Sequence, residues 1–293
     1  EIAGKKGSRM GLVEIPEIFI DNTDRNRTSP FAFTGNRFEF RAVGSSANCA
    51  GAMTTLNGAV AEQLLDFKAA VDVELAAGKT LQVAVMDTLK PLIASIIDTV
   101  CFEGNGYALT WKEEAARRGL DTETCVPEMF KAFLTPASVE MFARTGVYSE
   151  KELHARNEVK WETYAKKVQI EARVMVRMSI NHIIPAAIAY KASLLKEVSL
   201  YEKVYGDTDG CASELAILDD ISRYVEEVRQ RARQVEDARV EADALEDAYE
   251  RARAFADIAN MLFALRRPID ALEEVVDDKL WPLPKYRELL FIS

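Results

Sequence analysis

Two long apolar rows in the last third of the sequence have the spacing of packed helices. In the first row, apolar residues are separated alternately by three and four positions, as in a coiled-coil seam. This row consists of Leu218, Ile221, Val225, Val228, Ala232 and Val235. The second row has the same spacing and consists of Leu245, Tyr249, Ala252, Ala256, Ala259 and Phe263. We therefore predict a helical hairpin that turns near residues 243–247, with the intervening charges on its solvated face.

A further long helix is predicted upstream of this hairpin, from Ser149 to about Lys203. Ser149 is followed three residues later by Glu152, which is the spacing of a capping box at a helix start. Pro185 lies inside the segment and should kink or break the helix. Because residues 174–190 are apolar on most sides, we expect them to form the buried spine of the domain.

The segment before Ser149 also has helical periodicity. Apolar residues recur at three- and four-residue steps over residues 53–71, and Gly78 should end that helix. A second helix is expected over residues 81–97, either interrupted or begun afresh at Pro91. Shorter helices are predicted over residues 111–118, over residues 127–134 and after Pro136.

Strands are expected only near the start of the chain. The short apolar run at residues 17–20 and the alternating run at residues 37–43 are typical of strands. The predicted fold class is therefore mainly α with a small β part. We place the boundary between the two at residue 50, so that residues 1–50 contain the strands and residues 51–293 form a large helical domain.

Composition excludes several classes of protein. The net charge of −10 and the pI of about 5.0 argue against non-specific nucleic-acid binding, which needs clustered positive charge. No apolar run reaches the roughly 18–20 residues of a membrane helix, so we expect a cytoplasmic protein without a membrane partner. The four cysteines are widely separated and lack metal-site spacing, which favours reduced, inert thiols.

The stretch from Asp21 to Ser46 concentrates the charges that could carry chemistry. Strand alternation would send Arg37, Glu39 and Arg41 to one face and Phe38, Phe40 and Ala42 to the other. A carboxylate between two guanidinium groups suits a polyanion and its counter-cation, because arginine binds phosphate and glutamate binds divalent metals. The spacing is equally compatible with a solvated edge strand whose charges form weak surface pairs.

The literal sequence of this stretch resembles the catalytic segment of glutamine synthetases, specifically the large type III class. Residues 26–28 read Asn-Arg-Thr and correspond to an Asn-Arg-Ser element, and residues 37–41 correspond to a strand of the form R-x-E-x-R. Four further segments are similar to type III sequences, at residues 47–57, 166–174, 181–188 and 277–291. The resemblance thus covers nearly the whole chain, and it implies that the strands come from a glutamine-synthetase-type catalytic barrel.

The resemblance implies a role for each charged residue of the segment. Glu39 would bind the divalent ion, Mg²⁺ or Mn²⁺, that bridges the phosphates of ATP. Arg41 would engage substrate glutamate or the transferred phosphoryl group, and Arg27 would contact an ATP phosphate. Arg37 matches a basic position before the glutamate more loosely. Many family members carry a further arginine where this chain has Pro30 to Phe33, so one phosphate contact must be made differently here.

The resemblance also implies the substrates and the assembly. They are glutamate, ammonia and ATP, used by a ring-built homo-oligomer with active sites between subunits. Because the sequence starts at Glu1 without a methionine, and type III enzymes are much longer, we expect the C-terminal part of a larger protein. We expect such a part to lack synthetase turnover by itself.

Two other functions remain open at this point. A related ATP-dependent γ-glutamyl ligase that acts on an amine would use the same glutamate half-site. A non-enzymatic helical scaffold is the second alternative, because most of the chain is predicted to be seam-forming helix.

Two features of the central helix favour structural roles. Arg173 and Arg177 share one helix face with Glu171 nearby, and we interpret them as a buried or subunit-facing ion network in preference to an anion site. His182 lies on an apolar helix, where a hydrogen-bonded core histidine is more common than a general base.

Overall fold

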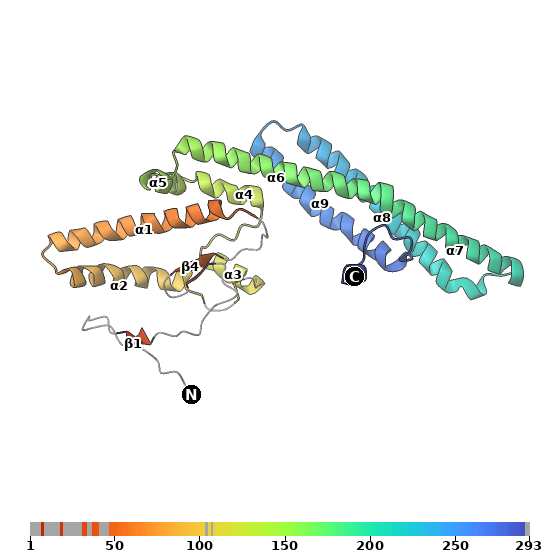
Figure 1. The fold of residues 1–293 in the computed structure, drawn as a ribbon, viewed down its shortest axis with the longest axis horizontal. Coiled ribbons are helices and arrows are strands. Elements are labelled where there is room, and N and C mark those ends of the chain that lie inside the picture. Colours follow the sequence, from red (N-terminus) through yellow and green to blue (C-terminus); the bar gives the residue numbers. More distant parts are fainter. Residues whose placement is uncertain are drawn as a thin grey trace. The chain divides into compact units, whose positions relative to one another are not determined.

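The computed structural model describes residues 7–8, 18–19, 31–33, 37–40, 47–102, 105–106 and 108–290. Helices dominate these residues, which confirms the predicted mainly α fold (Figure 1). The chain divides into two compact units, which are described separately. Unit 1 comprises residues 1–123 and 136–150, and unit 2 comprises residues 124–135 and 151–293. The predicted boundary at residue 50 stays a prediction.

The strands of unit 1 form two short antiparallel pairs. β1 (Gly7–Ser8) pairs with β2 (Ile18–Phe19), and β3 (Phe31–Phe33) pairs with β4 (Phe38–Phe40). β2 and β4 lie within the two predicted strand segments. β3 was not predicted, because Pro30 and Gly35 mark breaks on both sides of a three-residue strand.

Two long helices are the largest elements described in unit 1. α1 (Ala50–Ala76) and α2 (Leu81–Val100) form a hairpin, and Gly78 between them has a φ of +89°, a conformation that favours glycine. Pro91 lies inside α2 without ending it. The hairpin is followed by α3 (Leu109–Arg117), and α5 (Pro136–Arg144) packs against α1.

The α1–α2 hairpin exposes many large apolar side chains in this chain. Its buried residues are Gly58 and Val71 on α1 and Ala84 on α2. The exposed ones on α1 are Met53, Val60, Leu64, Leu65, Val73 and Leu75. Those on α2 are Leu81, Val83, Ile93, Ile96, Ile97 and Val100. Helices that are apolar on several sides are usually buried in larger structures.

The predicted long helix is the central element of unit 2. It consists of α6 (Glu150–Met178), the π-helical turn η2 (Ser179–Ile183) and α7 (Ile184–Tyr205), which run on as one rod (Figure 1). α6 starts directly after Ser149, as predicted. Two short elements, α4 (Val126–Lys131) and η1 (Ala132–Leu134), precede it in unit 2.

Pro185 explains the wide turn within this rod. Proline has no N–H, and its ring crowds the carbonyl group four residues earlier, so an ordinary α-helical turn is disfavoured there. The backbone N–H of Ile184 instead bonds to the carbonyl oxygen of Ser179, five residues back. The predicted break at Pro185 is therefore a π-helical turn.

The rod has one buried face and is not a spine buried on most sides. Its core-facing residues include Val176, Ile183, Ala187 and Leu194. Val174, Ile180 and Ile188 are exposed, contrary to the prediction for residues 174–190. The prediction for residues 174–190 assumed a regular α-helix. The extra residue of η2 rotates α7 relative to α6. Apolar residues that lie on one face in the structure therefore fall on several faces when they are plotted on a regular helix.

The predicted helical hairpin is formed by α8 (Ala212–Asp243) and α9 (Ala248–Val275). A 3-10 turn, η3 (Asp209–Cys211), leads into α8. The carboxylate of Asp247 caps α9 by accepting a hydrogen bond from the backbone N–H of Glu250 at 2.8 Å. The turn thus lies where it was predicted, although neither glycine nor proline marks it.

The first predicted seam is confirmed, whereas the second is confirmed only in part, because Ala252 and Ala256 of that row are buried. Five of the six residues of the α8 row are buried, and Val225 is partly buried. On α9, Phe263 of the predicted row is 71% exposed and Leu245 lies before the helix. The observed row alternates steps of three and four and consists of Phe255, Ile258, Leu262, Leu265, Ile269, Leu272 and Val276.

The core of unit 2 is formed by one cluster of apolar residues from the rod and the α8–α9 hairpin. After α9, Trp281 joins this cluster with 7% of its surface exposed. Trp281 thus docks the segment that follows α9 onto the core of unit 2. α10 (Tyr286–Leu290) follows it.

Candidate functional site

Two of the four predicted site residues lie on the described strand β4 and its edge. Glu39 is opposite Ala32 of β3 in the antiparallel register, and its side chain is half-buried. Arg37 directly precedes β4 and is exposed. Arg27 and Arg41 lie outside the described residues. The structure therefore describes one carboxylate and one guanidinium of the predicted constellation.

The strand exposes more apolar surface than the sequence pattern predicted. Phe40 was expected to pack behind the charged face, but 41% of its surface is exposed. Its cross-strand partner in the register is Phe31. Within this chain the strand pair therefore leaves an aromatic ring in contact with solvent.

Glu39 has the right chemistry for a divalent ion, because carboxylate oxygens are preferred ligands of Mg²⁺ and Mn²⁺. The part of the chain that the structure describes contains no group of three or more His, Cys, Asp or Glu side chains that could hold a metal ion. A divalent ion held by Glu39 would therefore need further ligands from outside the described residues.

Comparisons with known proteins connect this arrangement to one family. A sequence model described as the glutamine synthetase C-terminal domain matches residues 84–202. A glutamine synthetase of Bacteroides fragilis is 43% identical over 288 residues, which cover 97% of this chain and 39% of that protein. The chain belongs to the glutamine synthetase family.

Two further glutamine synthetases extend the comparison. The type-3 glutamine synthetase of Dictyostelium discoideum is 31% identical over 99% of this chain and 40% of its own length. A glutamine synthetase of Butyrivibrio fibrisolvens is 31% identical over 92% of this chain and 38% of its own length. The chain thus spans about two fifths of the length of the relatives that it matches.

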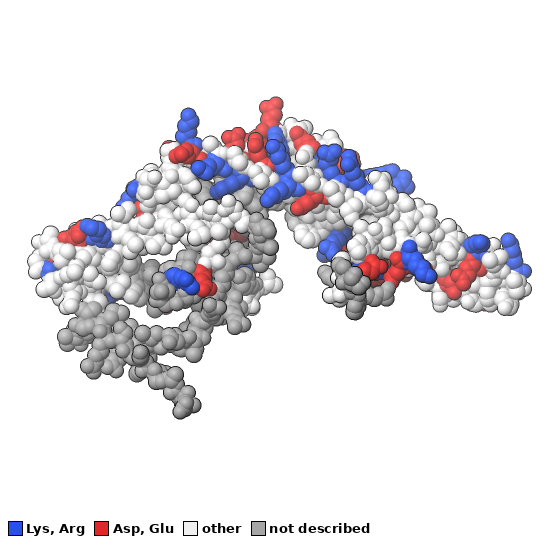
Figure 2. Space-filling view, in the orientation of Figure 1, with Lys and Arg blue, Asp and Glu red and all other residues white. Residues whose placement is uncertain are grey.

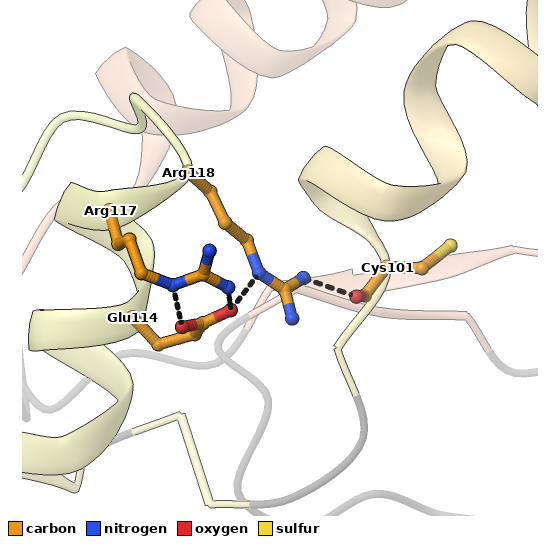
Figure 3. A network of polar contacts seen from close by, with 4 residues as sticks. All are labelled: Cys101, Glu114, Arg117 and Arg118. Carbon is orange, nitrogen blue, oxygen red and sulfur yellow. Dashed lines mark hydrogen bonds and ion pairs between the residues drawn. The ribbon is translucent and has the colours of Figure 1, made fainter.

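Within this glutamine synthetase domain, a polar network joins α3 to the end of α2 in unit 1 (Figure 3). The carboxylate of Glu114 accepts hydrogen bonds from Arg117 Nε at 2.7 Å and from Arg118 Nε at 2.6 Å. Arg118 Nη1 also donates to the carbonyl oxygen of Cys101 at 2.8 Å, which satisfies a group at the end of α2. Hydrogen bonds from Arg117 and Arg118 lower the pKa of Glu114 to about 2.

A second network joins α4 to α9 in unit 2. The hydroxyl of Tyr249 donates to the carboxylate of Glu128, which is also paired with Lys131 at 3.0 Å. The Lys131 ammonium lies 3.8 Å from the centre of the Tyr249 ring. Hydrogen bonds from Tyr249 and Lys131 lower the pKa of Glu128. The network links α4 to α9. Its central carboxylate, Glu128, is already bonded to Tyr249 and Lys131, so we interpret the network as structural.

Lys160 on α6 has an unusual environment. Its Nζ lies 3.0 Å from the centre of the Phe133 ring and 5.7 Å from that of Phe130. Burial and the neighbouring charge of Arg156 lower the pKa of Lys160 to about 8. The aromatic faces favour the charged ammonium form and so would raise the pKa of Lys160. Burial has the larger effect, so the pKa is lowered.

The two structural interpretations of the central helix have different outcomes. Arg173 and Arg177 are exposed in this chain, so they do not form a buried network, and the subunit-facing network stays a prediction. Their charges help to lower the pKa of Glu236 on α8, after the stronger effect of Arg239. His182 is exposed and is not a core histidine. The π-helical turn that contains His182 changes which residues face the core.

The described part of the chain contains no helix that is long and apolar enough to cross a membrane.

Proposed function

We propose that this chain forms part of a glutamine synthetase that joins ammonia to glutamate with hydrolysis of ATP. The observation that carries the proposal is the R-x-E-x-R pattern at residues 37–41, in a chain that is similar to glutamine synthetases over nearly its whole length. Because the chain spans about two fifths of those relatives, the other site groups would come from further parts of a longer protein.

The reaction explains why these residue types are needed. The side-chain carboxylate of glutamate attacks the γ-phosphate of ATP, so that ADP leaves and an acyl phosphate forms. Ammonia then attacks the acyl carbon, displaces inorganic phosphate and loses a proton to give the amide. Several negatively charged oxygens meet in this site, so cationic groups stabilise the transition state. In the proposal, Arg27 contacts an ATP phosphate, and Arg41 engages glutamate or the transferred phosphoryl group. Arg37 adds positive charge at the edge of the strand.

Glu39 would hold a divalent ion, Mg²⁺ or Mn²⁺, together with ligands outside the described residues. When bound, this ion would neutralise charge on the ATP phosphates. The half-buried position of Glu39 on β4 supports this role, because a strand fixes a carboxylate more precisely than a loop does. We further propose a ring-type homo-oligomer in the cytoplasm.

Two alternatives make different predictions. A γ-glutamyl-amine ligase would use the same glutamate half-site, but an amine would compete with ammonia for the acyl phosphate. A helical scaffold would not depend on Glu39 or Arg41, whereas substitutions in the α8–α9 seam would abolish its function. The similarity to proteins named glutamine synthetase favours the synthetase.

The test is ATP turnover by the longer protein that contains this chain, measured with and without glutamate and ammonia. We expect turnover that needs both substrates and that falls at least about a hundredfold in Glu39→Ala, as for loss of a group that stabilises transition-state charge. Glu113→Ala is the matched control, because this carboxylate on α3 is exposed. Turnover without ammonia, or full activity of Glu39→Ala, would contradict the proposal.

A further inference from the structure

A cavity of about 350 Å³ lies in unit 2 between α6 and the turn of the α8–α9 hairpin. α6 provides one wall, and the end of α8 and the start of α9 provide the other. The lining residues are Glu162, Ala165, Lys166, Gln169, Asp243, Arg251 and Phe255. The volume lies at the lower end of the range that is typical of small-molecule sites.

The walls of this cavity are held in place by hydrogen bonds. Asp243 accepts from Gln169 Nε2 at 2.6 Å and from Arg239 Nη1 at 2.5 Å, so both of its oxygens are satisfied. Arg251 Nε donates to the carbonyl oxygen of Leu245 at 2.8 Å and so fixes the guanidinium at the hairpin turn. The cavity therefore has ordered polar walls before any ligand binds.

Two charges in this cavity are left without partners within the described part of the chain. Glu162 and Lys166 are four residues apart on α6, but no hydrogen bond or ion pair joins them to each other or to another described residue. Side chains at this spacing lie about 5–6 Å apart at their Cβ atoms. One anionic and one cationic group thus lie side by side, with the guanidinium of Arg251 on the opposite wall.

The rest of the lining is apolar. Ala165 and Phe255 belong to the buried residues of unit 2, with 2% and 1% of their surfaces exposed. They place a small methyl group and an aromatic ring beside the charged groups. The lining thus suits a molecule with both charges at one end and an apolar group at the other.

We propose that this cavity binds a free α-amino acid with an apolar side chain. Its carboxylate would lie between Lys166 and Arg251, its ammonium group would pair with Glu162, and its side chain would contact Phe255. Because the α-carboxylate and α-ammonium are carried by the same carbon atom, they match two opposite charges on successive helical turns. Binding would also tie α6 to the hairpin turn, which gives the helical domain a means of sensing amino-acid supply.

Isothermal titration calorimetry of the 293-residue chain with L-valine tests the proposal. We expect saturable binding of L-valine and at least about tenfold weaker binding of isobutylamine and 3-methylbutanoate, which each lack one of the two charges. Lys166→Ala and Glu162→Gln should each weaken L-valine binding by about tenfold or more. Lys167→Ala, on the next position of α6 and outside the cavity lining, should leave it unchanged.

Several results would overturn the proposal. They are the absence of saturable L-valine binding, equal binding of either one-charge analogue, and unchanged affinity in both cavity variants. Circular dichroism of each variant distinguishes a lost contact from lost folding. The helix content should stay constant, because Glu162 and Lys166 make no hydrogen bond or ion pair with another described residue. Because binding is measured without ATP turnover, failure here leaves the proposed synthetase function untouched.

Discussion

At the scale of single residues, Gly210 is a position where one added methyl group has no room. Gly210 lies in η3, before α8. A Cβ atom at this position would lie 2.6 Å from Cζ of Tyr201 and closer still to its hydroxyl oxygen. The Tyr201 ring also packs against Tyr205, with ring centres 4.4 Å apart, so its displacement would disturb a second ring.

We therefore expect Gly210→Ala to lower the free energy of unfolding by about 1–3 kcal/mol, the usual cost of overpacking. Gly58→Ala on α1 is the matched control, because its Cβ would lie at an ordinary 3.6 Å from the Phe142 ring. Alanine also has a higher helix propensity than glycine, so this control should be neutral or stabilising. Urea unfolding followed by circular dichroism measures both changes, and equal effects of the two substitutions would contradict the expectation.

Single residues are also where prediction from sequence is least successful. Asn157 is fully buried, and neither of its side-chain amide atoms has a hydrogen-bond partner among the described residues. Composition and periodicity give no signal for such a residue, because buried polar groups are normally paired. His182 was predicted to be buried and is exposed, since a regular helical projection does not include the π-helical turn.

At the scale of secondary-structure elements, the contact between α4 and α9 depends on a few side chains. Besides the network around Glu128, the indole N–H of Trp161 donates to the carbonyl oxygen of Pro127 at 2.9 Å, which joins α4 to α6. The rings of Trp161 and Tyr249 lie edge to face, with centres 5.4 Å apart. The short helix α4 is thus fixed to two long helices by directional contacts.

We expect Tyr249→Phe to lower the melting temperature by about 2 °C at pH 7, because a hydrogen bond to a carboxylate is lost while the ring contacts remain. The pKa of Glu128 is lowered in the folded state, so the contact stabilises the fold above the ordinary value of 4.5 and is lost as pH falls through the folded-state pKa. The difference between the two proteins should therefore shrink below about pH 4.5. Thermal melts at several pH values measure it.

Tyr190→Phe is the control for this comparison, because Tyr190 packs against the core without a hydrogen bond from its hydroxyl group among the described residues. A pH-independent effect of Tyr249→Phe, or an equal effect of Tyr190→Phe, would show that the ring and not the hydroxyl is responsible.

The helices themselves were predicted well because apolar periodicity extends over many turns. α1, α6 and α8 each begin within about six residues of the first residue predicted for them. The choice between apolar rows on α9 was only partly right because two rows with the same three-four spacing overlap there. Only packing against α8 selects the row that contains Phe255 and Leu265, and the sequence of one helix contains no information on that contact.

At the scale of the whole molecule, net charge and exposed apolar surface have opposite effects on self-association. The chain has 47 acidic and 37 basic residues. On the visible face the two signs are interspersed along the helices and do not form a patch of one sign (Figure 2). Repulsion due to the net charge of −10 therefore acts between whole molecules, while the exposed side chains of the α1–α2 hairpin favour association.

We expect self-association of this chain to be strongest near its pI of about 5.0, where the net charge vanishes. Light scattering between pH 4 and 8 should have its maximum there, at least about twice the value at pH 7.5. A double substitution of Leu64 and Leu81 by serine should lower the maximum without moving it, because neither change alters the charge. Val204→Ser, at an exposed position on α7, is the control, and a maximum far from pH 5 would contradict the expectation.

The similarity to glutamine synthetases could be inferred from the sequence because residues 26–28 and 37–41 form a specific pattern. The geometry of the proposed site could not be inferred, because Arg27 and Arg41 lie outside the described residues and the proposed metal ligands other than Glu39 do not belong to this pattern. The same limit applies to the cavity beside Lys166, since one wall comes from α6 and the other from the α8–α9 turn, more than 70 residues later in the sequence.

The five residues from Ser179 to Ile183 also determine how the rod tolerates changes in length. A π-helical turn contains one residue more than an α-helical turn, so it shifts the phase of everything that follows. Deleting one residue there would rotate α7 by about 100° relative to α6 and turn Ala187 and Leu194 away from α8. The core contacts of α7 therefore depend on the exact number of residues in η2, and losing one residue at Ser179 would change every later contact of the rod.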